Sequence, residues 1–111
     1  MVEQQAPNMA PVVEIEVRLQ DGSLVADPDE LVLPRDKAPR VVIWRAHSSI
    51  QEITDVSFKD NPLGQITTPV GAGPIWVCVD RCTVAGQWNY SISATLNDGY
   101  GVVLDPMIRN Q

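Results

Sequence analysis

Residues 88–96 read WNYSISATL, a stretch in which apolar and polar side chains alternate without interruption. This two-residue period predicts a β-strand with one buried and one solvated face. Residues 97–99, Asn-Asp-Gly, tolerate the positive φ angles of a tight reversal, and residues 102–104, Val-Val-Leu, then resume an apolar run. We therefore expect a β-hairpin over residues 88–109, whose apolar face is covered by other strands.

Shorter apolar runs elsewhere predict the covering strands, at residues 13–19, 31–33, 40–46, 53–58 and 75–79. Bordering prolines place 31–33 at a sheet edge, and the nearly continuous apolar run at 40–46 predicts a central strand paired with 53–58. The Asp-Pro pairs at 27–28 and 105–106 are expected to set turns or bulges. No stretch combines helical spacing with a cap and sufficient length, so six to eight short strands predict an all-β, antiparallel β-sandwich. The expected core includes Val42, Trp44, Phe58, Trp88, Tyr90, Ile92 and Leu104.

Composition sets limits on organisation and partners. The 111 residues are 44% hydrophobic and 20% charged, which is typical of one globular domain. We assign that domain to residues 12–111, after a flexible N-terminal tail at 1–11. The formal charge is −6 and the basic residues are scattered, which argues against nucleic acid as a partner. No apolar run is long enough to span a membrane and no secretory signal is visible, so we expect a cytoplasmic protein.

The residues that could bind a metal or react are few. His47 is the only histidine, and with Cys78, Cys82 and Met107 it offers the soft ligands that copper selects. An electron-transfer copper site needs a second imidazole, and a structural zinc site needs four ligands. A Cys78–His47 nucleophile pair would lack a third, orienting group. Four residues of strand separate the cysteines by roughly 13 Å, so we expect free thiols, with Cys78 packed as a small apolar residue and Cys82 more exposed in a turn.

A long loop favours protein binding. Residues 61–74 hold three prolines and three glycines, and long loops in small β domains often carry function. The three tryptophans are expected in the core, except that Trp76 beside this loop could line a recognition surface. The sequence therefore predicts a non-enzymatic module without cofactor that binds a protein partner or itself through a sheet edge or this loop, with Leu63, Ile66, Val70 and Trp76 as contact residues. The alternative is a metal-binding or redox protein that uses His47 with Cys78 or Cys82.

The last third of the chain resembles a known family. Residues 86–92 (GQWNYSI), 98–99 (DG) and 104–108 (LDPMI) are similar to small bacterial cupredoxin-like domains of unassigned function, and the resemblance extends over residues 24–110. It implies a Greek-key sandwich, cupredoxin-like or immunoglobulin-like. Copper-binding cupredoxins carry Cys, His and Met on the loop before the last strand, whereas residues 97–101 contain none of them. The resemblance therefore implies a fold and no copper-ligand role.

Overall fold

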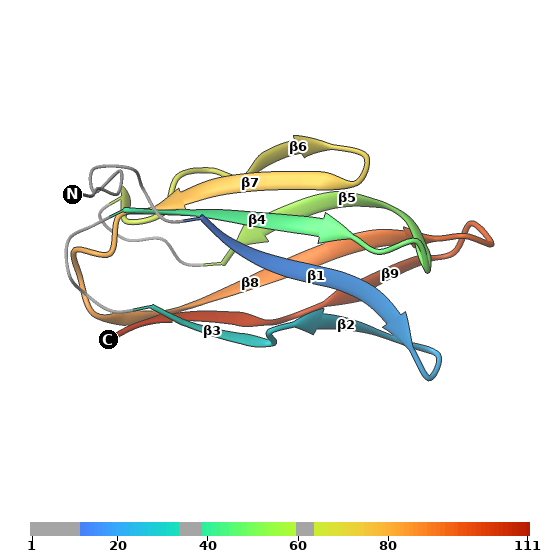
Figure 1. The fold of residues 1–111 in the computed structure, drawn as a ribbon, viewed down its shortest axis with the longest axis horizontal. Helices are drawn as coiled ribbons and strands as arrows, with labels where there is room; N and C mark the ends of the chain where they lie inside the picture. Colours follow the sequence, from blue (N-terminus) through green and yellow to red (C-terminus); the bar gives the residue numbers. More distant parts are fainter. Residues whose placement is uncertain (1–11, 34–38, 60–63) are drawn as a thin grey trace, which may run out of the picture.

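The computed structural model describes residues 12–33, 39–59 and 64–111. Strands make up most of these residues and stack in two sheets (Figure 1). In this described part of the chain, no helix has the length and apolar character needed to span a membrane. The strands are β1 (Val12–Gln20), β2 (Ser23–Asp27), β3 (Glu30–Leu33), β4 (Arg40–Ala46), β5 (Ile50–Phe58), β6 (Val70–Ala72), β7 (Ile75–Asp80), β8 (Gly86–Leu96), β9 (Gly101–Leu104) and β10 (Met107–Asn110).

The two sheets are mixed, which corrects the expectation of a purely antiparallel sandwich. The first sheet has the order β2-β1-β4-β7-β6, and the second has the order β3-β10-β8-β5, with β9 also paired to β8. The pairs β1–β4 and β3–β10 are parallel. The parallel pairing of β1 with β4 arises because the chain leaves the first sheet after β2, runs through β3 in the second sheet, and returns in the direction of β1 (Figure 1).

The predicted C-terminal hairpin is confirmed, and its second arm is broken in two. β9 pairs with the second half of β8 and β10 with the first half, so both strands lie along the same neighbour. The break falls at Asp105-Pro106, where the Tyr90 N–H donates to the Pro106 carbonyl at 3.2 Å. The turn before β9 places Gly99 at φ 96°, a value that favours glycine. The other Asp-Pro pair, at 27–28, lies where the chain passes from β2 to β3.

The sequence predicted where strands occur more accurately than it predicted which strands pair. β3 is an edge strand and β4 lies inside its sheet, as expected. The expected pairing of β4 with β5 is wrong, because β4 lies between β1 and β7 while β5 pairs with β8. The short strands β2 and β6 were not predicted: β6 is fully exposed and so shows no buried period, and β2 follows a tight turn directly after β1.

The core forms where the two sheets face each other, and it is centred on three aromatic side chains. Trp44 and Tyr90 are fully buried, and the Trp44 Nε1–H donates to the Tyr90 hydroxyl at 3.0 Å. The Phe58 ring lies 4.9 Å from that of Tyr90, centroid to centroid, and is itself only half buried. The predicted core is confirmed: five of the seven side chains are buried, and Phe58 and Leu104 pack against them, the buried five being Val42, Trp44, Trp88, Tyr90 and Ile92.

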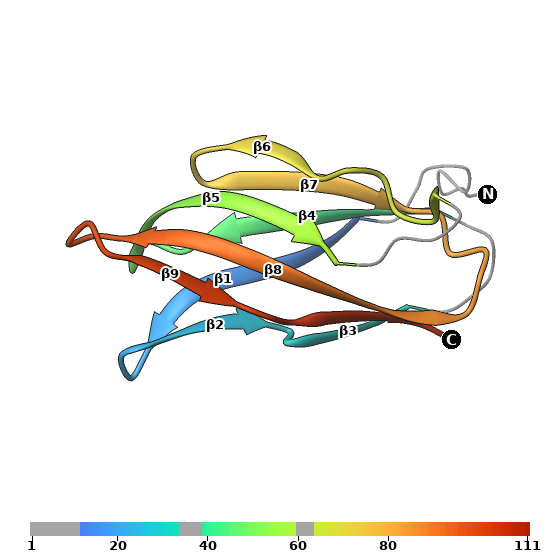
Figure 2. The ribbon, with the colours of Figure 1, turned by 180° about the vertical axis from the view of Figure 1, so that it is seen from behind.

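The two lateral sides of the sandwich are closed in different ways. On one side, which we call the closed side, the chain itself crosses between the sheets from β2 into β3. On the other, which we call the open side, β5 runs beside the β6–β7 hairpin of the first sheet (Figure 2). There the Ile53 N–H donates to the Gly73 carbonyl at 3.0 Å, and the Trp76 Nε1–H donates to the Ile53 carbonyl at 3.0 Å. These bonds tie only the first half of β5 to the opposite sheet.

Candidate functional site

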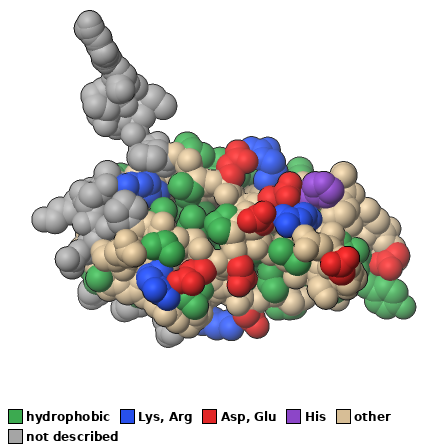
Figure 3. All heavy atoms as spheres, turned by 60° about the horizontal axis from the view of Figure 1, so that its bottom comes forward, with side chains coloured by type: hydrophobic (Ala, Val, Ile, Leu, Met, Phe, Trp, Pro, Cys, Tyr) green, Lys and Arg blue, Asp and Glu red, His purple; other side chains and the backbone are tan. Residues whose placement is uncertain are grey.

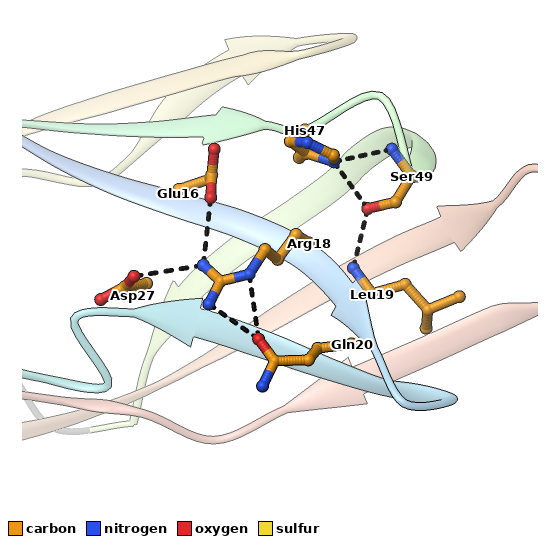
Figure 4. Close-up of polar contacts among 7 residues, drawn as sticks. All are labelled: Glu16, Arg18, Leu19, Gln20, Asp27, His47 and Ser49. Atoms are coloured by element: carbon orange, nitrogen blue, oxygen red, sulfur yellow. Dashed lines mark hydrogen bonds and ion pairs between the residues drawn. The ribbon is translucent and has the colours of Figure 1, made fainter.

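His47 lies exposed at the end of β4 and holds a turn in place. Its Nδ1 accepts the Ser49 N–H at 3.0 Å and lies 2.9 Å from the Ser49 hydroxyl. That hydroxyl in turn accepts the Leu19 N–H of β1 at 2.9 Å (Figure 4). The imidazole therefore links the β4–β5 turn to β1, which is a structural role for the nitrogen that it uses.

Charged side chains on the closed side, and on the neighbouring strands β1 and β4, are arranged in ion pairs. The Arg18 guanidinium contacts Glu16 at 3.0 Å and Asp27 at 3.2 Å, and it also donates to the Gln20 side chain (Figure 4). Arg45 pairs with Glu14 at 3.2 Å, and Arg109 with Glu30 at 2.6 Å. Acidic and basic side chains consequently alternate over this part of the surface (Figure 3).

Neither thiol is poised to react. Cys78 is 3% exposed, and burial, followed by the charge of Asp80, raises the pKa of its thiol to about 12. Cys82 is fully buried with φ 56°, which contradicts its expected exposure in a turn. Cys82 does lie in the connection between β7 and β8, but its side chain points into the protein, and the Cys82 Sγ lies 3.6 Å from the Asp80 carbonyl oxygen.

The proposed metal ligands lie on different parts of the fold. Cys78 is in register with Val42, and His47 lies five positions after Val42, just beyond the end of β4, which is roughly 16 Å along an extended chain. Among the described residues, no three His, Cys, Asp or Glu side chains gather where they could hold a metal ion. Metal binding through His47 with Cys78 or Cys82 stays a prediction that no contact between these side chains supports.

A buried polar cluster around Asp80 was not predicted from the sequence. The fully buried Asp80 carboxylate accepts three hydrogen bonds at Oδ1: from Gln65 Nε2 at 3.2 Å, the Cys82 N–H at 3.0 Å and Asn110 Nδ2 at 2.9 Å. Asn110 also accepts the Trp88 Nε1–H at 3.0 Å. Oδ2 of Asp80 has no hydrogen-bond partner within the described ranges. The only hint in the sequence is that Asp80 lies two residues after Cys78, so both side chains fall on the same face of the strand.

This cluster anchors the segment that precedes β6. The Gln65 carbonyl accepts the Arg81 N–H at 3.0 Å, while the Gln65 side chain bonds Asp80. Thr67 then bonds β7 twice, because its N–H donates to the Val79 carbonyl at 2.9 Å and its hydroxyl accepts the Val79 N–H at 2.8 Å. The next two residues, Thr68 and Pro69, are thereby held opposite the second half of β5.

A groove of about 300 Å³ lies between that segment and β5, and we call it the seam groove. Its apolar floor contains the buried Val56 and Pro69 and the half-buried Phe58. Its rim is polar and exposed. Among the described residues, its lining consists of Asp55, Val56, Ser57, Phe58, Thr68 and Pro69.

The backbone of β5 faces this groove. The Lys59 N–H donates to the Asn89 carbonyl of β8 at 3.0 Å, so Lys59 directs its backbone groups toward β8. Because these groups alternate along a strand, Val56 and Phe58 direct their N–H and C=O groups away from β8 and into the groove. β8 is the strand partner of β5 in the described part of the chain, so these groups lack a ladder partner there. β5 thus presents a free edge above an apolar floor.

The four predicted contact residues are placed differently. Val70 is 61% exposed on the edge strand β6, whereas Ile66 is buried. Trp76 points toward β5 and closes the first half of the open side; a Cβ on Gly71 would lie 2.6 Å from its Cγ, which is why glycine occurs there. Leu63 lies outside the described residues. The predicted loop does contribute Thr68 and Pro69, but the β5 half of the groove was missed, because pairing order decides which strand edge is free.

Comparisons with known proteins give no family. No family model matches the chain, and no curated protein matches it. The structure is similar to the crystal structure of McoA multicopper oxidase from the hyperthermophile Aquifex aeolicus, with 10% sequence identity and a TM-score of 0.40. The match covers 98% of this chain and 31% of that chain, so the chain spans about a third of its length. A likeness this weak supports no argument about reaction or cofactor; the all-β sandwich is established by the strands themselves.

Proposed function

We propose that this chain is a non-enzymatic interaction module of the cytoplasm that binds a protein partner, or a second copy of itself, through the seam groove. The observation that carries the proposal is the free edge of Val56 and Phe58 beside an apolar hollow. An extended segment can add to such an edge, with main-chain hydrogen bonds supplying affinity and side-chain pockets supplying specificity.

The remaining chemistry supports a binding role. His47 uses Nδ1 to hold a turn, and the Cys78 thiol stays protonated at neutral pH because burial raises its pKa to about 12. The net charge of −6 disfavours nucleic acid as the partner. Together with the absence of Cys, His and Met from residues 97–101, these features favour a cupredoxin-like domain that works without copper.

The expected affinity is modest. The groove runs beside Asp55–Phe58, so it can accept a segment of about four to six residues. Each main-chain hydrogen bond contributes a net free energy of about 1 kcal/mol, and ordering the segment opposes binding. We therefore expect dissociation constants in the micromolar range or weaker for an isolated segment.

Site-specific photocrosslinking of the full chain in its own cells tests this function. A photoreactive amino acid at Thr68, on the groove wall, is compared with one at Val32, which is 43% exposed on the closed side. We expect adducts at position 68 only. Hydrogen exchange of the purified adduct partner with the chain should then protect the Val56 and Phe58 amides. Equal adducts at both positions, or none at position 68, would refute the proposed function.

Light scattering after size-exclusion chromatography separates the two kinds of partner. If the segment comes from a second copy, the chain dimerises as its concentration rises, and the crosslinked product has twice the mass of the chain. If it comes from another protein, the purified chain stays monomeric and the adduct has a different mass.

A further inference from the structure

We infer that the seam groove takes an extended cationic segment in which lysine or arginine alternates with aliphatic residues. This inference rests on the proposed function and adds the chemistry of the partner. The apolar floor of the groove, the direction of the β5 backbone and the distribution of charge support it.

The side chains of an added strand would alternate between the two faces of the sheet. A segment that bonds Val56 and Phe58 would direct every second side chain toward the floor. That floor is apolar, and Phe58 continues it into the core through its contact with Tyr90. The inward residues of the segment should therefore be aliphatic. The outward residues would lie beside Asp55 and Ser57, which are exposed on the opposite face of β5.

The charge beside that outward row is negative. Every carboxylate on β1, β2 and β3 forms an ion pair with an arginine, whereas Glu52 and Asp55 on β5 form none with the described residues. The nearby Lys59 is already paired with Asp105 at 3.1 Å, so it leaves the charge of Asp55 uncompensated. Cross-strand neighbours of opposite charge stabilise a strand pair, and like charges destabilise it.

The charge of this chain disfavours a second copy as the occupant of the groove. A second copy of this chain would bring a formal charge of −6 to the groove. Repulsion between two such molecules opposes association, whereas a cationic segment is attracted and steered to the rim. The occupant that fits the charge is consequently a basic segment of another protein.

The probe is the peptide acetyl-Lys-Val-Lys-Val-Lys-amide, titrated into the full-length chain and followed by amide chemical shifts. Three further peptides serve as comparisons: one with glutamate in place of lysine, one with the same composition but both valines adjacent, and one N-methylated at alternate amides so that it cannot pair with a strand edge. We expect saturable shifts centred on Val56 and Phe58 with the first peptide. Each comparison peptide should bind with an affinity at least about tenfold lower.

Two variants with the same change in charge locate the contact. Asp55→Asn should weaken the lysine peptide about threefold, which is the scale of an exposed ion pair. Asp98→Asn removes one charge from the exposed β8–β9 turn, keeps the oxygen that accepts the Tyr100 N–H, and should leave the affinity unchanged. Both substitutions are on exposed positions and should leave the fold intact.

Several results would overturn the inference. One is a glutamate or N-methylated peptide that binds as tightly as the lysine peptide, and another is an Asp98→Asn variant that weakens binding as much as Asp55→Asn. Binding of no peptide would also overturn it, and the proposed function would then stand or fall on the crosslinks at Thr68. Shifts at Val56 and Phe58 that grow with protein concentration alone would identify a second copy as the occupant, which refutes the cationic segment but keeps the function.

Discussion

The closed and open sides of the sandwich solve the same problem differently. A sandwich of two sheets has strand edges on both sides, and free edges attract other chains. On the closed side the backbone passes from β2 to β3, so covalent continuity joins the sheets. On the open side the chain also passes between the sheets, from β5 to β6, but through the longer connection at residues 59–69. Among the described residues, two hydrogen bonds at Ile53 join β5 to the opposite sheet, and the edge beyond them faces the seam groove.

The charges follow the same division. Arginines neutralise the carboxylates of β1, β2 and β3, and they fix neighbouring strands to one another. The carboxylates of β5 have no such partners among the described residues. This contrast in charge agrees with the proposal that a partner binds on the open side.

The largest effect is expected from removing the anchor of the groove wall. Asp80→Ala deprives Gln65, Asn110 and the Cys82 N–H of their buried acceptor, which should lower the free energy of unfolding by about 3 kcal/mol. Urea denaturation measures this loss. Asp80→Asn is the matched control, because its Oδ1 can still accept the same bonds, and it should cost no more than about 1 kcal/mol. Equal stability of Asp80→Ala and the native chain would show that the cluster does not anchor the wall.

The next largest effect concerns the closed side. Leu31 is 8% exposed and its neighbour Val32 is 43% exposed on the same edge strand, β3. Leu31→Ala should lower the free energy of unfolding by about 2 kcal/mol, since it removes buried methyl groups, whereas Val32→Ala should stay within about 0.5 kcal/mol. Neither should alter peptide binding at the groove. Loss of binding in Leu31→Ala, while the chain remains folded, would show that the two sides are coupled.

Part of the fold could be predicted from the alternation of apolar and polar residues. Alternation identified β8 and the hairpin, because one face of that strand is buried and the other wet. The same logic failed for β6, whose three residues are all exposed, and for the pairing of β4 with β5. The period of the apolar residues shows which face of a strand is buried. It does not show which other strand pairs with it.

The candidate site was predictable only in outline. Prolines and glycines marked the loop that supplies Thr68 and Pro69, but Val56 and Phe58 resemble any core residues in sequence. Their role depends on β5 lying at an edge, which is a property of the whole topology. The Asp80 cluster was equally hidden, because its members come from residues 65, 80, 82 and 110 and meet only after folding.

The pH dependence of the free energy of unfolding shows how well the core excludes water from the Cys78 thiol. Its raised pKa means that the native state keeps the thiol proton while the unfolded chain releases it near pH 9.0. The free energy of unfolding should therefore be constant with pH below about 9 as far as this group is concerned, and fall by about 1.4 kcal/mol per pH unit from there toward pH 12. Buried Tyr90, whose pKa burial also raises, steepens the fall above its ordinary value.

The matched variant for this measurement is Cys78→Ala, in which the slope above pH 9 should lose the share that Cys78 contributes, about 1.4 kcal/mol per pH unit. At pH 7 the thiol of the native chain should also be alkylated no faster than the whole chain unfolds. Fast alkylation at neutral pH would show that water reaches past Phe58, and the open side would then extend into the core.

A smaller effect is expected where the open side is closed. Trp76→Phe keeps the apolar ring but removes the hydrogen bond to the Ile53 carbonyl, which should lower the free energy of unfolding by about 1 kcal/mol. Hydrogen exchange of the Ile53 amide should become faster, because its bond to Gly73 would lose its neighbour. Unchanged exchange at Ile53 would show that the Gly73 bond alone holds this half of β5.

The smallest effect concerns the outer face of the second sheet, where Asp105 pairs with Lys59 near the groove. The Ser91 hydroxyl, 2.7 Å from Asp105, lowers the pKa of that carboxyl, and Lys59 lowers it further. A lowered pKa stabilises the fold above the ordinary pKa of aspartate, and this stabilisation is lost as pH falls through the native value. Ser91→Ala should raise the Asp105 pKa toward its ordinary value, as followed by its carboxyl chemical shift, and stability at pH 7 should hardly change because both groups are exposed. Since Lys59 keeps its partner, binding of the lysine peptide should also be unaffected; weaker binding would mean that Lys59 had been freed to repel it.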